Sequence, residues 1–203
     1  MNRLVNKAAC IILISTLIWS MPFAAFAAEN DVLRTNHINV SDTIDSTSRY
    51  LVKTVSNPEI SSVGGEWAIL GLARSGAETP ENYYERYYEN VVSELKSKSG
   101  ELTRVKYSEY SRLILALTAI GRDVTDAGGC NLLEKLSDYN SVIKQGINGP
   151  IFALLAFDCG NYAVPRTAGV TVQTTRELLI DYILDKEITD ADGVKGGFSL
   201  SDD

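Results

Sequence analysis

The chain has 203 residues, of which 45% are hydrophobic, and its formal net charge is −7. This length suggests one domain or part of one, with enough apolar residues to bury a core. An acidic chain without a basic cluster is a poor partner for nucleic acid or an anionic membrane surface, so we expect neither.

The first 27 residues have the pattern of a secretory signal peptide. Arg3 and Lys7 provide a positive start, residues 8–19 are apolar, and Ala25-Phe26-Ala27 supplies the small residues of a cleavage site. The apolar segment is too short for a stable membrane span. We therefore expect a protein that is secreted or held at the cell surface, with no membrane segment after cleavage. Loss of Arg3 and Lys7 leaves 17 basic against 26 acidic residues, a net charge of −9.

The small number of histidines and cysteines excludes several kinds of chemistry. His37 is the only histidine, and it lies in the polar, aperiodic stretch 28–40, which we predict to be a linker. A Ser-His-Asp triad or a histidine-rich zinc site therefore cannot be built around a helical core. Only Cys130 and Cys159 follow the signal segment, too few for a disulfide scaffold.

Residues 41–203 repeat a short apolar helix that ends in glycine. Three twelve-residue units can be aligned, at 65–76 (GEWAILGLARSG), 110–121 (YSRLILALTAIG) and 149–160 (GPIFALLAFDCG). Their first residues are 45 and then 39 apart, and Gly196-Gly197-Phe198 predicts a fourth start, 48 after the third. In the third unit, Pro150 is expected at the first helical position and Gly160 as the terminating glycine. Helices this apolar on all sides are buried.

Amphipathic helices are expected between the apolar ones. They are predicted over 42–55, from Thr79-Pro80 (cap and first position) to about Lys98, over 131–143, and from Thr174 or Thr175 onwards. Strand signals are nearly absent, and the short β-like run 170–172 lies in an expected loop. The sequence therefore predicts an all-α fold of helix pairs, with amphipathic helices in an outer layer and apolar helices in an inner layer. A closed or partly closed double ring is favoured over a solenoid.

The GGEW motif at 64–67, and GGF at 196–198, resemble the α/α toroid of terpenoid cyclases and protein prenyltransferases. The strings at 64–76, 106–123, 145–158 and 174–184 are similar to secreted, cell-surface toroid proteins of Gram-positive bacteria with prenyltransferase/squalene-oxidase repeats. The resemblance covers residues 41–203 and implies a toroid whose inner and outer helices alternate. Such proteins often carry surface-anchoring modules or a cobalamin-carrier-like domain further on.

The resemblance also implies that this toroid is incomplete. The family's ring has roughly six helix pairs, whereas about three and a half repeats fit into 41–203. Half a ring leaves apolar inner faces open, because each repeat buries its surface against a neighbour. We expect a fragment, with the remaining repeats or anchoring domains as partners. Pairing of the open edge with another chain is the alternative.

In such a ring the inner helices run the same way, so their first turns gather on one rim. The rim would hold Glu66, Trp67, Tyr107, Glu109, Tyr110, Arg112, Gln145 and Asn148. One interpretation is a ligand-binding rim with aromatic walls and a few convergent polar groups. The other is structural: Glu66 and Glu109 cap helices and pair with Arg112 or Arg176, while Trp67 and the tyrosines fill the space between rings.

Catalytic motifs of toroid enzymes are not found in this sequence. DxDD, DDxxD and GCGEQ are absent, and a prenyltransferase zinc site would need a histidine beside Asp158-Cys159. Glu66 and Glu109 could flank a sugar only at a separation that the sequence does not define. We therefore expect a non-catalytic module with no metal or cofactor, which binds a small molecule or a surface polymer. The alternatives are a polyisoprenoid-processing or polysaccharide-cleaving enzyme with further residues downstream, and a structural spacer.

Cys130 and Cys159 are placed at ends of one expected antiparallel helix pair. Those ends would meet, so the geometry allows a disulfide. A bridge over a loop of about 30 residues would stabilise the fold by roughly 3–4 kcal/mol in the chain-entropy model. The alternative is two buried free cysteines that pack as small hydrophobic residues.

Overall fold

The computed structural model describes residues 39–60 and 62–200. The chain divides into two compact units, residues 1–43 and 44–203, and nearly all described residues belong to the second. The expected signal peptide at 1–27 and most of the expected linker at 28–40 lie outside the described residues.

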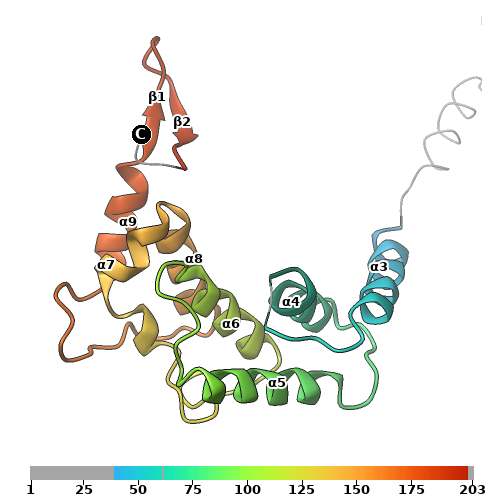
Figure 1. Ribbon diagram of the computed structural model, residues 1–203. Helices are drawn as coiled ribbons and strands as arrows, with labels where there is room; N and C mark the ends of the chain where they lie inside the picture. Colours follow the sequence, from blue (N-terminus) through green and yellow to red (C-terminus); the bar gives the residue numbers. More distant parts are fainter. Residues whose placement is uncertain (1–38, 61, 201–203) are drawn as a thin grey trace, which may run out of the picture. The chain divides into compact units, whose positions relative to one another are not determined.

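Seven α-helices and one two-stranded sheet form the regular structure of the described residues (Figure 1). The helices are α3 (Val40–Thr54), α4 (Trp67–Ser75), α5 (Tyr83–Ser97), α6 (Ser108–Ala119), α7 (Tyr139–Val142), α8 (Asn148–Cys159) and α9 (Arg176–Leu184). Single turns of other helix types are η1 (Ser62–Glu66), η2 (Glu134–Leu136) and η3 (Ile143–Gln145). The antiparallel strands are β1 (Glu187–Thr189) and β2 (Lys195–Phe198). Apart from this short hairpin, the regular structure of the described residues is helical, which confirms the all-α part of the prediction.

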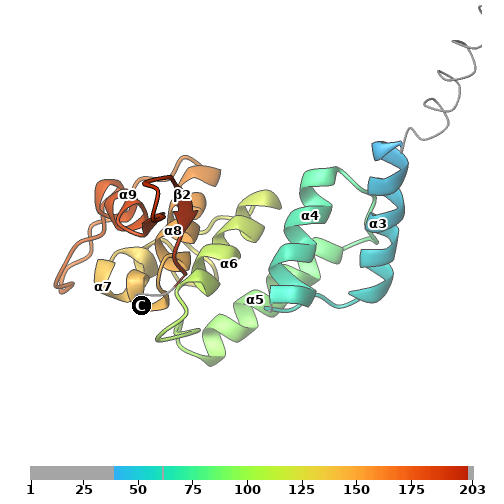
Figure 2. The same cartoon turned by 90° about the horizontal axis from the view of Figure 1, so that it is seen from above.

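The three apolar helices form one layer. α6 packs between α4 and α8, and α9 packs against the other side of α8 (Figure 2). α5 contributes one fully buried stripe to the same core, in which the residues recur every fourth position: Tyr83, Tyr87, Val91 and Leu95. This spacing places all four on one face of a helix, which is why the polar remainder of α5 faces solvent.

The apolar units are confirmed as helices, and their glycines act in two ways. Gly76 and Gly121 follow α4 and α6 with φ of +67° and +72°, the left-handed conformation that ends many helices. Gly160 ends α8 differently, because its φ is −121° and the left-handed residue is Asn161. A Cβ on Gly160 would lie 2.3 Å from the ring of Tyr162, so this glycine is required for close packing.

Two units also begin at a glycine that touches a carbonyl group. A Cβ on Gly65 would lie 1.9 Å from the Glu59 oxygen, and one on Gly149 would lie 1.8 Å from the Val142 oxygen. Pro150 is the third residue of α8, not the first as predicted. It still falls in the first turn, where the missing N–H removes no helical hydrogen bond.

The amphipathic helices are confirmed in part. α3 matches the first, and α9 begins after Thr175, whose side chain accepts a hydrogen bond from the Leu178 N–H as an N-cap. The predicted start of α5 at Thr79-Pro80 is wrong, because Asn82 has a left-handed backbone (φ 61°) and the helix begins at Tyr83.

The predicted helix over 131–143 is wrong. This segment forms η2, α7 and η3 instead. An extended Asp138, with φ −93° and ψ 106°, separates η2 from α7, and η3 follows α7 directly. Short polar side chains compete for the backbone here. Asn131 Oδ1 accepts hydrogen bonds from the N–H groups of Leu133 and Glu134. Asp138 Oδ2 accepts one from the Ser141 hydroxyl. The Asp138 bend pairs with Gln173, beside the β-like run at 170–172.

The predicted fourth inner helix at Gly196-Gly197-Phe198 is also wrong, because these residues lie in β2. Asp190 Oδ1 accepts hydrogen bonds from the N–H groups of Asp192 and Val194, and Gly193 is left-handed with φ 80°. This is turn chemistry that reverses the chain, and two consecutive glycines are poor helix formers. The chain therefore returns as a hairpin.

Candidate functional site

The first turns of α4 and α6 and the turn before α8 are joined by a chain of polar contacts. Arg112 Nε lies 3.7 Å from Glu66 Oε2, and Arg112 Nη1 donates to Ser108 Oγ at 3.3 Å. Ser108 Oγ donates to Gln145 Oε1 at 2.8 Å, and the Ser108 N–H donates to the same oxygen at 3.4 Å. We call Glu66, Arg112, Ser108 and Gln145 the rim network. The structure thus brings together three of the predicted rim residues and adds Ser108.

The ion pair of the rim network is buried. The side chain of Glu66 is 2% exposed and that of Arg112 is 16% exposed. Two opposite charges at this depth stabilise each other chiefly by avoiding the penalty of an unpaired buried charge. The Glu66–Arg112 pair of the structural interpretation is present. The rest of that interpretation is not shown, because the Glu66 side chain forms no cap hydrogen bond and Trp67 is exposed. Arg176 pairs elsewhere, with the Asp158 carboxylate and, through Nη2, with the Tyr162 carbonyl at 3.1 Å.

Tyr87 of α5 lies under this ion pair. Burial raises the pKa of its hydroxyl well above the usual value, the negative charge of Glu66 raises it further, and Arg112 opposes both. Among the described residues, this hydroxyl has no hydrogen-bond partner. Tyr87 is therefore neutral at any physiological pH and acts as a buried aromatic side chain, not as an acid or base.

Trp67, which is exposed, and Phe152, which is half-buried, form an aromatic pair. Their ring centroids are 5.9 Å apart, and Trp67 is 41% exposed although it lies in an apolar helix. Trp67 begins α4 and Phe152 belongs to α8, while α6 packs between these helices. Neighbouring helix axes lie about 8–10 Å apart, so side chains of the outer two can meet only where the layer is curved. We call this side of the layer, with Trp67, Phe152 and the 48% exposed Leu155, the aromatic face.

The remaining predicted rim residues have different surroundings. The hydroxyl of Tyr110 accepts a hydrogen bond from the Leu102 N–H and donates one to the Gly100 carbonyl, so Tyr110 anchors the loop before α6. Tyr107 packs on Tyr110 with centroids 5.6 Å apart, and Lys144 lies 6.0 Å above the Tyr107 ring. Glu109 is half-buried and acts electrostatically on Lys98, and Asn148 begins α8.

The two glutamates considered for sugar cleavage do not form a matched pair. Glu66 is buried against Arg112, whereas the field of Glu109 acts on Lys98 at the end of α5. A glycosidase needs two carboxyl groups that face one substrate, one of them free to donate a proton. Among the described residues, no group of three or more Asp, Glu, His or Cys side chains is placed to hold a metal ion.

The possible disulfide is absent from the structure, where Cys130 and Cys159 are both free, as in the alternative; Cys130 is half-buried, but Cys159 is exposed and not buried as that alternative expected. Cys130 packs against Gly100, where an added Cβ would lie 3.0 Å from the sulfur. Cys159 donates a hydrogen bond to the Ala156 carbonyl at the end of α8. The prediction assumed one continuous helix antiparallel to α8, and the broken segment 131–145 removes that geometry. Burial raises the pKa of both thiols.

Sequence reasoning missed three residues of this region. Ser108 lies one helical turn before Arg112 on the same face, a spacing that could have identified it. Tyr87 lies within the predicted amphipathic helix, and nothing local indicates that the charges of Glu66 and Arg112 act on it. Phe152 was assigned to the helix body, because its contact with Trp67 joins segments 85 residues apart in the chain.

No helix in the described part of the chain is long and apolar enough to cross a membrane. Comparisons with protein-family models, with curated proteins and with solved structures find no match for this chain.

Proposed function

We propose that this chain is a secreted or cell-surface binding module of the α/α toroid type, without catalysis of its own. Its ligand, a small molecule or a surface polymer, would lie on the aromatic face. The observation that carries this proposal is the Trp67–Phe152 pair, in which the exposed ring of Trp67 lies beside the half-buried ring of Phe152. Exposed aromatic side chains of this kind offer contact area at low entropic cost.

The toroid interpretation rests on repeated local structure. The first and third apolar units both begin at a glycine in contact with a carbonyl group six or seven residues upstream. In both, the residues that follow enter a helix of the same layer. Equivalent positions of the units, such as Leu70, Leu115 and Leu154, are all half-buried. Repeats built alike and stacked side by side are what a toroid or a related helical array requires.

The charged side chains of this region are paired with one another, which favours binding over catalysis. Glu66 and Arg112 form an ion pair, Arg112 also donates to Ser108, and Asp158 holds Arg176. These groups position helices, so a ligand on the aromatic face would meet mainly apolar and aromatic atoms. A ligand with a flat apolar side, such as a sugar ring or an isoprenoid, fits this surface chemically.

Tryptophan fluorescence gives a direct test. Trp19 and Trp67 are the only tryptophans, so a chain carrying Trp19→Phe reports on the aromatic face alone. We would titrate it with cell-wall oligosaccharides, polyisoprenyl phosphates and cobalamin-like ligands, and follow thermal unfolding in parallel. A ligand at about 100 times its Kd should stabilise the fold by roughly 2.7 kcal/mol.

Variants locate the binding. Phe152→Ala should abolish the fluorescence change, whereas Phe198→Ala, which removes an exposed phenyl group from β2, should leave it intact. Binding that survives Phe152→Ala would place the ligand elsewhere. Turnover of any ligand would favour the toroid-enzyme alternative, and no response to any class would favour a structural spacer.

A further inference from the structure

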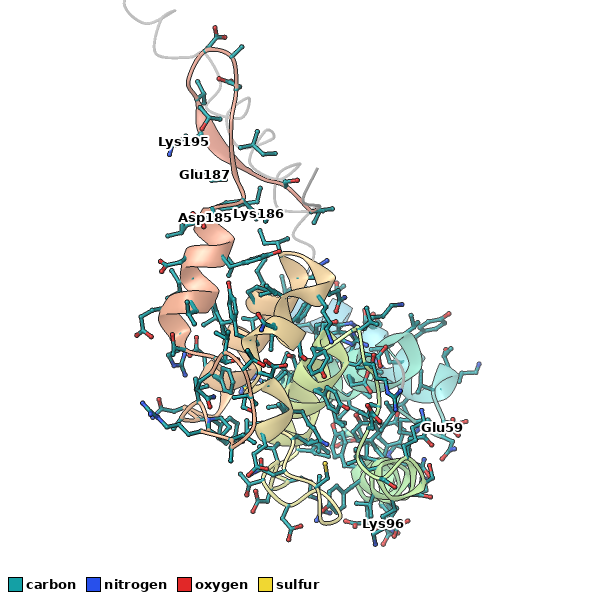
Figure 3. All side chains as sticks on the ribbon, turned by 60° about the vertical axis from the view of Figure 1, so that its left-hand side comes forward. Glu59, Lys96, Asp185, Lys186, Glu187 and Lys195 are labelled. Carbon is teal, nitrogen blue, oxygen red and sulfur yellow. The ribbon has the colours of Figure 1, made fainter. Side chains whose placement is uncertain are left out.

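The β1–β2 hairpin stands clear of the helices and has an open edge. Figure 3 shows it projecting beyond α9, with Lys186 and Glu187 near its base and Lys195 nearer the turn. Among the described residues, no third strand pairs with this sheet. A two-stranded hairpin alone is marginally stable in water, and an open edge offers unpaired backbone groups to another strand.

The backbone of β1 presents alternate residues to the open edge. The Lys186 carbonyl accepts from the Ser199 N–H, and the Asp190 N–H donates to the Val194 carbonyl, so both residues face β2. The irregularity in the pairing comes from Gly196, which has no partner on β1, and β1 itself stays regular. Because alternate residues of a strand bond to opposite sides, the N–H and C=O groups of Glu187 and Thr189 face outward.

This edge is complementary to itself. When two copies of β1 are placed antiparallel about a twofold axis at Ile188, Glu187 falls opposite Thr189, and these are the outward-bonding residues. Lys186 then falls opposite Asp190, so each end of the pairing joins opposite charges. Opposite charges directly across an antiparallel pair stabilise it, and like charges oppose it.

The exposed apolar side chain of β1, that of Ile188, lies at the centre of this pairing between two copies. Ile188 is 51% exposed and lies over Gly197, where an added Cβ would be 3.8 Å from its side chain. A glycine opposite leaves the isoleucine without a side-chain neighbour within the hairpin. In the antiparallel pair, the Ile188 residues of the two copies would lie side by side.

We infer that β1 is an interaction surface for a second copy of this chain, which pairs antiparallel to it about Ile188 in a four-stranded sheet. The pairing adds four backbone hydrogen bonds, two Lys186–Asp190 contacts and one Ile188–Ile188 contact. It goes beyond the proposed ligand binding and does not depend on it. The contact is small, so the dimer is weak and forms reversibly at high protein concentration.

Symmetric cysteine cross-linking tests the register. In the full chain with Cys10, Cys130 and Cys159 replaced by serine, Ile188→Cys places two thiols across the axis. Residues opposite each other without backbone hydrogen bonds have Cα atoms about 4.5 Å apart, within the range of a disulfide. We expect mild oxidation to yield disulfide-linked dimers at least tenfold faster for Ile188→Cys than for the controls.

Two control variants carry the cysteine at exposed positions that the twofold axis does not bring together. Thr189→Cys lies on the same strand, where its symmetry mate is displaced by two residue pairs, beyond disulfide reach. Val194→Cys is 62% exposed but follows the hairpin turn on the far side from the edge. Equal cross-linking of all three variants would show random collision. An Ile188→Cys chain that stays monomeric at every concentration would show that the edge serves another partner or none.

The charge pairs give a second, independent test. Lys186→Glu converts both end contacts to repulsions and should slow Ile188→Cys cross-linking about tenfold, given roughly 0.7 kcal/mol for each of the two contacts. Adding Asp190→Asn should restore most of the rate, because asparagine keeps the Oδ1 acceptor that holds the turn. Lys53→Glu makes the same charge change on α3 and should have no effect. An unchanged rate in Lys186→Glu would overturn the proposed register.

Discussion

α5 and the segment 131–145 differ in continuity although both bury leucine, valine or tyrosine side chains in the same core. α5 is one helix of 15 residues, whereas the other segment is divided among η2, α7 and η3. The buried residues of α5 recur at every fourth position, without interruption by residues that cap. In 131–145, the Asn131 and Ser137 side chains bind nearby backbone groups, and the Asp138 carboxylate accepts a hydrogen bond from the Ser141 hydroxyl. Hydrophobic burial therefore holds a segment in place but does not by itself make it helical.

The largest effect is expected where the broken segment meets α8. Gly149→Ala would place a methyl group 1.8 Å from the Val142 carbonyl oxygen, so the end of the segment and the start of α8 cannot both keep their positions. We expect a loss of more than about 4 kcal/mol in the free energy of unfolding, measured by urea denaturation.

Gly71→Ala is the matched control for Gly149→Ala. Gly71 lies within α4, and no atom is within 4 Å of an added Cβ. Alanine in a helix interior is about 1 kcal/mol more favourable than glycine, so this variant should be more stable than the wild type. A stable Gly149→Ala protein would mean that the contact with Val142 does not constrain the fold.

The next effect concerns the stripe of α5. Tyr87→Ala removes a fully buried ring and should cost about 3–4 kcal/mol. Tyr87→Phe keeps the ring and removes a hydroxyl that has no hydrogen-bond partner among the described residues, so its stability should lie within about 1 kcal/mol of the wild type or above it. A much larger loss in Tyr87→Phe would show that the hydroxyl is bound, most simply by a buried water molecule.

A smaller effect is expected at the first break of the 131–145 segment. Asn131→Ala removes the acceptor for the N–H groups of Leu133 and Glu134 and should cost about 1 kcal/mol, as the loss of a helix cap does. Asn140→Ala, an exposed asparagine within α7, should be nearly neutral in the same denaturation experiment. Equal costs for the two variants would remove the argument that Asn131 organises the turn.

The smallest effect is on thiol reactivity. Cys130 precedes the broken segment and Cys159 ends α8, and burial raises the pKa of both thiols. A raised pKa lowers the thiolate fraction at pH 8, so both should react with a thiol reagent more slowly in the folded protein than free cysteine does. Denatured, unreduced protein should show every cysteine as a free thiol, and a deficit of two would restore the disulfide.

Part of the candidate site could be predicted from the sequence, through its resemblance to a toroid. The first turns of the apolar helices were expected to bring Glu66, Arg112 and Gln145 together, and they do so through Ser108. The choice between ligand binding and structural pairing could not be made in that way. It depends on distances between side chains from three helices, and only the packing of those helices defines them.

The sequence by itself determined the three apolar helices, the amphipathic stripe of α5 and the capped start of α9, because periodicity and capping act over a few residues. Only the tertiary structure decided that Glu66 forms an ion pair with Arg112 and that Trp67 packs on Phe152. It also decided that segment 131–145 is not one continuous helix and that Gly196-Gly197 lies in a strand. The physical reason is the same in each case. These outcomes depend on competition between backbone hydrogen bonds, capping side chains and partners distant in the chain, and local hydrophobicity carries no information about which of them prevails.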